Sequence, residues 1–303
     1  MRTRYFASSF LRWLSGTILL VVLTKLLPAA PLKLHPERLS ATDLALNGLL
    51  AGVPAGEVRF VRWADLRALP SIKLRPNGEY LTGAEELTVV LLSELWQALP
   101  RNVAADTLLA TCNDGYASVY GIDLIGRGRP FLILEINGLP PDRWPPPGMK
   151  SNPGPYLIWL TTSFAPEVAR LLDPAHKKPW GVISLEVASR ADRFRGAFAG
   201  RWAALSSRAE AGRTIWIDSC ASCHTGPGNT FGGTKGGVPF AQLASDAQLR
   251  PEYFKQYIRA PKSLRPDAKM TAHSHYTDTQ LAAILAFVAA EPPEKSASKV
   301  SAP

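Results

Sequence analysis

The sequence predicts two domains, a β-rich α+β domain followed by an all-α domain. The chain has 303 residues, and a length of this order favours two domains. Residues from about 55 to 195 carry short runs of β-branched and aromatic residues separated by turn signals. Residues from about 203 to 290 instead carry helical patterns around the pentapeptide CASCH, which occupies residues 220–224. A hydrophobic content of 46% is sufficient for a core in each domain.

The first 30 residues are typical of a targeting segment. Three arginines in the first twelve residues precede the apolar run LSGTILLVVL, and small residues near Ala30 offer a cleavage site. The run is short for a membrane span, and Lys25 interrupts it. A cleaved signal peptide and an uncleaved inner-membrane anchor both stay open. Either one exports the remaining chain, so we expect a periplasmic protein.

The first domain is expected over residues 55–198. Its short helices are predicted at WADLRAL and LSELWQAL, and its turns at NDG, GRGRP, NGLPPDRWPPPG and SNPGP. The strand-like runs are rich in β-branched and aromatic residues. They are GEVRFVRW, LTVVLL, DTLLATC, ASVYGIDLI, PFLILEIN, YLIWLT and WGVISLEV.

The second domain is expected over residues 203–291, as three helices and two loops. Ser207 and Glu210 have the spacing of a capping box, as do Thr277 and Gln280 at the last helix. Pro251 stands at a first-turn position of a middle helix. Residues 292–303 have the composition of a disordered tail.

The pentapeptide contains two of the three cysteines of the chain, Cys220 and Cys223, followed by His224. A Cys-x-x-Cys pair can be a redox dithiol, half of a zinc site or the attachment point of c-type haem. A dithiol enzyme needs a βαβ context, whereas a glycine-rich loop follows here. Zinc needs further ligands, which His273 and His275 could provide. The spacing favours haem, with each thiol bonded to one vinyl group and His224 below the iron.

A haem of this type needs a second axial ligand after the motif. Methionine and histidine are the usual choices. Met270 is the only methionine after residue 224, and it stands in a polar loop where a core-filling role is not expected. We therefore expect Met270 as the ligand, with His273 and His275 as alternatives.

These features resemble a class I cytochrome c domain. The resemblance rests on GRTIWIDSCASCH, GGVPF, YIRAPKSLRPDAKM and the amphipathic last helix, and it covers less than a third of the chain. It implies that the first and last helices cross at Gly212, with Trp216 and Phe287 beside the crossing. It also implies that a proline carbonyl holds the His224 imidazole. Pro239 is the expected residue and Pro227 the alternative, and such a bond would fix the tautomer.

The first domain resembles the molybdopterin-binding domain of sulfite-oxidase-like oxidoreductases. The resemblance lies in the order of WADLRALP, LTVVLLSELWQALP, TLLATCNDGYASVYGIDLI, PFLILEINGLPP, GPYLIWL and KKPWGVISLEV, over roughly 140 residues. It implies that a cysteine thiolate binds molybdenum, and Cys112 is the only cysteine outside the haem motif. The alternative for Cys112 is a small buried apolar residue.

The net charge of +9 and the pI near 9.6 limit the kinds of partner that the protein is expected to bind. The basic residues are scattered and no binding motif for nucleic acid is present, so we expect no nucleic acid. A cationic surface near a haem edge would steer an acidic redox partner. A solvated surface without a partner is the alternative.

Two functions follow from these observations. The first is an exported electron-transfer protein with one covalent haem c and a first domain that docks it or binds a ligand. The second is a molybdopterin-dependent oxidoreductase of the sulfite-oxidase type that passes electrons to its own haem. Both use the haem in the same way, and molybdenum content would separate them.

Overall fold

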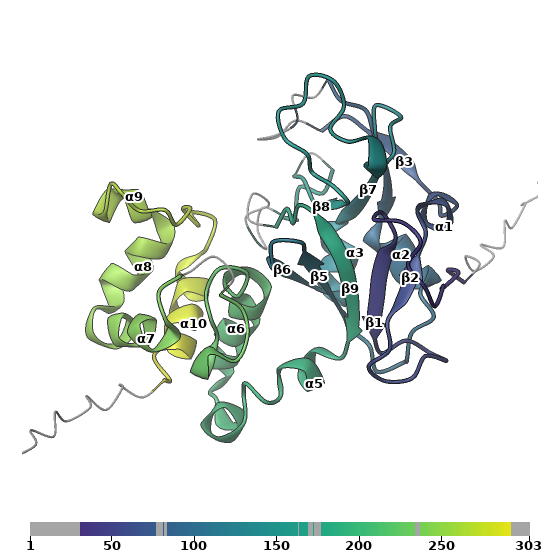
Figure 1. Cartoon of the computed structure of the whole chain (residues 1–303). Helices are drawn as coiled ribbons and strands as arrows, with labels where there is room; N and C mark the ends of the chain where they lie inside the picture. The colour runs from purple at the N-terminus through teal and green to yellow at the C-terminus, as the bar shows by residue number, and fades with distance from the viewer. Residues whose placement is uncertain are drawn as a thin grey trace, which may run out of the picture.

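The computed structural model describes residues 31–76, 81, 84–162, 164–168, 172, 177–233 and 237–291. Figure 1 shows two lobes side by side, one rich in strands and one made of helices. We call them the strand-rich lobe, which ends with residue 188, and the helical lobe, residues 207–291. The chain passes between them through α5 (Arg190–Phe194). The expected targeting segment and the expected tail lie outside the described residues.

One sheet of the strand-rich lobe has five strands in the order β2-β1-β9-β5-β6. Strands β1 and β9 pair in parallel, and the other neighbours are antiparallel. The strands are β1 (Leu44–Gly48), β2 (Arg59–Val61), β5 (Thr107–Cys112), β6 (Ala117–Gly121) and β9 (Val182–Ala188). Strand β1 precedes the expected domain boundary at residue 55, so the sheet includes residues N-terminal to that boundary.

A second sheet has four antiparallel strands in the order β3-β4-β7-β8. They are β3 (Ile72–Leu74), β4 (Leu87–Leu91), β7 (Phe131–Ile136) and β8 (Leu157–Trp159). Both faces of this sheet are covered. Leu132 and Leu134 point into the core shared with the five-stranded sheet, and Phe131 and Ile133 point into a separate apolar cluster. This alternation explains why the run PFLILEIN is almost continuously apolar.

Among the α-helices that the structure describes in this lobe, α1 (Trp63–Arg67) and α2 (Leu92–Ala98) were predicted. The prediction for ASVYGIDLI was wrong in its second half, where the chain forms α3 (Ile122–Gly128) instead of continuing the strand. Leu124 and Ile125 of α3 are buried in the core. Neighbouring apolar residues in a short run fit a helix as well as a strand, so the pattern did not separate the two.

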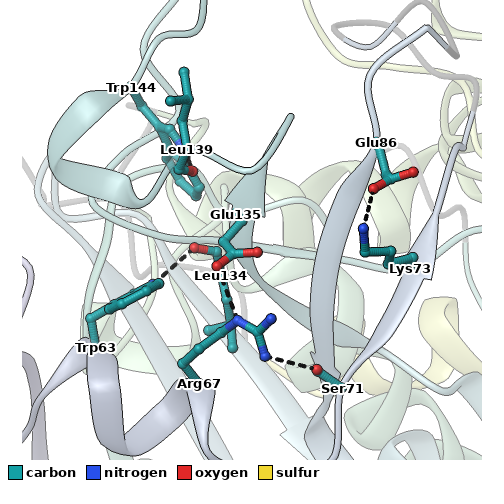
Figure 2. A network of polar contacts seen from close by, with 9 residues as sticks. All are labelled: Trp63, Arg67, Ser71, Lys73, Glu86, Leu134, Glu135, Leu139 and Trp144. Atoms are coloured by element: carbon teal, nitrogen blue, oxygen red, sulfur yellow. Dashed lines mark hydrogen bonds and ion pairs between the residues drawn. The ribbon is translucent and has the colours of Figure 1, made fainter.

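Polar contacts fix α1 to the four-stranded sheet, as Figure 2 shows. The Trp63 indole N–H donates to the Leu134 carbonyl at 3.0 Å. The Arg67 guanidinium donates to the Glu135 carboxylate at 3.0 Å. These bonds join segments about 70 positions apart in the sequence. They hold α1 across β7, at a distance from the helical lobe (Figure 1).

The five-stranded sheet has a different neighbour on each face. On β5, Leu108 and Ala110 face the core of the strand-rich lobe, whereas Leu109 faces the core of the helical lobe. Val119 on β6 likewise faces the helical lobe. The period of two in a strand places these alternating residues on opposite faces. One sheet therefore contributes to the cores of both lobes.

The helical lobe has more helices than the three that were predicted. The predicted capping box at Thr277 and Gln280 is confirmed, and so is Pro251 in the first turn of its helix. The first helix is capped by Ser206, one residue before the expected Ser207. Two helices, α7 and α9, were not predicted. The helices are α6 (Ser207–Ile215), α7 (Phe240–Leu249), α8 (Pro251–Arg259), α9 (Pro261–Leu264) and α10 (Asp278–Val288).

Helices α6 and α10 cross at Gly212, as the resemblance to class I cytochrome c domains implied. A Cβ atom on Gly212 would lie 2.0 Å from the Ala283 carbonyl oxygen. The rings of Trp216 and Phe287 lie beside this crossing, with centroids 5.9 Å apart. Only a residue without a side chain permits so close an approach of two helix backbones. In the part of the chain that the structure describes, no helix has the length and apolar character needed to cross a membrane.

Candidate functional site

The CASCH motif begins at the last residue of a π-helical turn, η4 (Trp216–Cys220), that continues α6. The backbone N–H groups of Cys223 and His224 both donate to the Cys220 carbonyl, at 3.0 and 2.9 Å. The motif therefore forms a tight turn in which His224 lies one helical turn after Cys220. Single π-helical turns of this kind are frequent at functional sites.

The two cysteines differ in exposure, since Cys220 is half-buried and Cys223 is exposed. Burial raises the pKa of the Cys220 thiol to about 12. A redox dithiol needs a thiol whose pKa is lowered, so this environment does not favour the dithiol alternative. Among the described residues, no three His, Cys, Asp or Glu side chains come together as a metal-binding group. The zinc alternative with His273 and His275 therefore has no support there.

The His224 side chain is held against the glycine-rich segment that precedes α7. A Cβ atom on Gly237 would lie 2.9 Å from His224 Nδ1, so the backbone passes directly beside the imidazole. Burial lowers the pKa of His224, and the backbone carbonyl of Val238 partly offsets this effect. Nδ1 itself is buried and makes no hydrogen bond of normal geometry within the described residues. With Nδ1 directed at the backbone, Nε2 is the nitrogen left to bind a metal.

The carbonyl near the imidazole thus belongs to Val238 rather than to the expected Pro239. The Pro239 carbonyl accepts the backbone N–H groups of Gln242 and Leu243, at 3.1 and 3.2 Å, in the first turn of α7. Pro227, the alternative residue, is buried in a short 3-10 turn, η5 (Pro227–Asn229). A proline as the partner of His224 stays a prediction, and Val238 is the residue that sequence reasoning missed.

Met270 lies in the loop between α9 and α10, half-buried. It packs against the same apolar cluster as Cys220, a cluster that includes Trp216 and Phe287. The structure therefore directs the methionine and the first cysteine of the motif toward one core. Its role as an iron ligand stays a prediction.

The two alternative ligands, His273 and His275, are engaged with Tyr276. The ring of His273 stacks on Tyr276 at a centroid distance of 5.6 Å, and its backbone N–H donates to the Ile258 carbonyl at 2.9 Å. The ring of His275 lies 4.1 Å from the same tyrosine. The rings of both histidines are therefore held against Tyr276.

The site fits a flat apolar cofactor with one polar ligand. Trp216 is buried 5.9 Å from the His224 ring, and its indole Nε1 has no hydrogen-bond partner within the described residues. A buried donor, Trp216 Nε1, thus lies beside the motif without a hydrogen bond to any described residue. Such an atom is rare in folded proteins and points to a polar group that completes it when a cofactor is bound.

A comparison with protein families assigns the helical lobe. Residues 207–288 match the family model described as cytochrome C oxidase, cbb3-type, subunit III. Residues 207–288 form a cytochrome c domain. The match runs from α6 to α10 and includes the CASCH motif and Met270. No curated protein matches the chain.

The strand-rich lobe and the connection that follows it contact the cytochrome c domain close to the CASCH motif. The Lys177 ammonium donates to the backbone carbonyl of Asp218, and the Arg190 guanidinium forms an ion pair with the Asp218 carboxylate. Tyr116, in the turn after β5, forms a side-chain hydrogen bond with Ser222 inside the motif. Strand β6 packs against η4.

Sequence reasoning missed these contacts between the lobes. One signal was available, since Asp218 is the only acidic residue between Glu210 and Asp246 and stands two positions before Cys220. The sequence around Asp218 does not indicate which cations contact it, because Lys177 and Arg190 lie 41 and 28 positions away.

Cys112 lies inside the core of the strand-rich lobe. It is 2% exposed and belongs to a cluster made almost entirely of apolar side chains, including Ala110 and Val182. A molybdenum centre needs polar and cationic groups around the thiolate and the pterin phosphate. These surroundings do not fit such a centre, and they do fit a small buried apolar residue.

Proposed function

We propose that this protein is an exported c-type cytochrome that transfers electrons through one covalently bound haem. The carrying observation is the geometry of His224. Its imidazole follows directly after the two cysteines, and its Nδ1 faces the backbone of Gly237 and Val238, so that Nε2 is available for iron. The chain has a single Cys-x-x-Cys-His motif, which supports one haem.

Each residue of the site has a definite task in this proposal. Cys220 and Cys223 would form thioether bonds to the two vinyl groups, and His224 and Met270 would bind the iron. The bound haem takes up and releases one electron at a time. The carbonyl of Val238 faces the imidazole, and a hydrogen bond from Nδ1 to it on haem binding would orient the ring and raise its basicity. A thioether opposite the imidazole raises the reduction potential.

The strand-rich lobe is proposed as the dock for the cytochrome c domain. Leu109 and Val119 of its sheet extend the apolar core of the domain, and the contacts to Asp218 and Ser222 reach the motif itself. The sulfite-oxidase-like fold is proposed for the architecture of this lobe alone. The environment of Cys112 gives no support to molybdenum chemistry.

The partner is proposed to be an acidic redox protein outside the cytoplasm. Three cationic residues near Met270 are exposed, namely Lys262, Arg265 and Lys269. Together with the net charge of +9, they would steer an anionic partner toward this edge of the domain. The basic and apolar character of residues 1–30 supports export, with or without an anchor. Fractionation of the producing cells tests the location.

Covalent haem is the decisive test. Protein from an exporting cell should keep its haem through denaturing gel electrophoresis. Changing both Cys220 and Cys223 to serine should abolish this retention. Cys112→Ser is the matched control and should keep the haem, since its side chain lies in the other core. Haem that is extracted from the unaltered protein by acid and solvent would refute the proposal.

A further inference from the structure

Two cations meet one carboxylate of the cytochrome c domain next to the haem motif, namely Lys177 of the strand-rich lobe and Arg190 of the connecting helix α5. Lys177 and Arg190 flank β9 on its two sides in the sequence, and both reach Asp218. Asp218 lies within the π-helical turn that ends at Cys220. The central sheet is therefore tied to the segment that would carry the first thioether bond.

Lys177, Arg190 and Asp218 together carry a net positive charge. Lys177 is 3% exposed, and its ammonium also lies 5.1 Å from the centre of the Tyr120 ring. Burial lowers its pKa to about 8, which keeps the ammonium mostly charged at neutral pH. Arg190 carries a second positive charge, and its side chain is three-quarters buried. Asp218 balances only one of the two.

We propose that Lys177 and Arg190 raise the reduction potential of the haem, so that the strand-rich lobe tunes the electron carrier as well as docking it. This inference rests on the proposed function. Ferric haem carries one more positive charge than ferrous haem, so a nearby cation disfavours the ferric form. The effect is strong for a buried charge, because the surrounding dielectric is low and salt screens it little.

Two variants that weaken the same contact separate charge from docking. Lys177→Met removes a positive charge and should lower the potential. Asp218→Asn removes a negative charge with almost no change in shape, and it should raise the potential. If the lobes simply moved apart, both variants would shift the potential in the same direction. The two potentials are measured by spectroscopic redox titration of the full-length holoprotein at mildly acidic pH, so that Lys177 stays protonated when Asp218, which raises its pKa, is replaced.

Two further variants complete the experiment. Lys177→Arg keeps the charge and should keep the potential close to that of the unaltered protein. Lys178→Met is the matched control, because Lys178 lies over the Trp159 ring in the other sheet, 4.8 Å from its centre, and should give a much smaller shift. If Lys177→Met fails to fold, the inference is tested with Asp218→Asn alone. A reduction potential of the Asp218→Asn variant that falls or stays unchanged then overturns the inference.

The outcome is independent of the test for covalent haem. Each variant is first checked for haem retention on a denaturing gel. Absence of covalent haem in the unaltered protein refutes the proposed function. Covalent haem with shifts of equal sign in Lys177→Met and Asp218→Asn, or with no shift in either, leaves the proposed function standing and overturns the tuning role of the strand-rich lobe.

Discussion

Gly212 of α6 lies directly against the Ala283 carbonyl of α10, where a Cβ atom would come within 2.0 Å of the oxygen. The same Cβ would lie 2.9 Å from the Cβ of Phe287. Both obstacles are close to or part of the backbone, so neither can move aside by a rotamer change. The packing of the first and last helices of the cytochrome c domain therefore depends on this glycine.

Gly212→Ala should destabilise the protein by about 3 kcal/mol, at the upper end of the cost of overpacking. The helices must separate to admit the methyl group. Gly126→Ala is the matched control, since Gly126 lies in helix α3 and a Cβ there meets nothing within 4 Å. The control should be neutral or stabilising by up to ~1 kcal/mol. The measurement is the free energy of unfolding in denaturant, and equal stability of the two variants would contradict the prediction.

Phe198→Ala should cost about 3–5 kcal/mol, the range for truncating a large buried aromatic residue. Phe198 is 7% exposed, and its ring packs 6.0 Å from Phe287 and 5.5 Å from Phe231. It lies in the connection between the lobes, yet it belongs to the core of the helical lobe. Leu249→Ala, at a residue that is 77% exposed, should change stability by ~0.5 kcal/mol or less. A small loss at Phe198 would mean that the connection does not form part of that core.

Met270→His should keep a low-spin haem and lower its reduction potential. An imidazole favours ferric iron more than a thioether does. The charge-transfer band of methionine-ligated ferric haem should be present in the unaltered protein and absent in the variant. Met149→Leu is the control, because Met149 packs against the four-stranded sheet, and it should keep the band. Lack of the band in the unaltered protein, with bis-histidine spectra that vanish in a His273 or His275 variant, would show that a histidine is the ligand.

Cys112→Ser should leave haem reduction by a generic electron donor unchanged. The thiol is 2% exposed among apolar side chains, so its replacement costs packing and buries a hydroxyl, about 1–2 kcal/mol in all. Stability and the rate of haem reduction are measured on the same preparation. Loss of a stoichiometric bound metal or of substrate turnover in this variant would reverse the preference for an electron carrier.

Much of the cytochrome c domain could be predicted because its signals are local. The Thr277 capping box and Pro251 in a first turn each lie within a few residues of the feature that they specify. The crossing at Gly212 was implied by the family resemblance instead, because its contact with Ala283 joins distant parts of the sequence. The cysteine and histidine spacing is equally short. Helix α7 was missed because its first residue follows Pro239 in a segment that the glycine-rich pattern marked as a loop.

The sequence by itself determined the strand-rich and helical halves, the haem motif and the candidate ligand Met270. Only the tertiary structure decided that β1 pairs in parallel with β9, about 140 positions away, and that Lys177 and Arg190 meet at Asp218. Side-chain alternation in strands and capping of helices depend on residues a few positions apart. They do not show which distant segment covers a residue. Burial of a lysine, a cysteine or one face of a strand depends on that distant surface, so the contact between sheet and motif appears only in the folded chain.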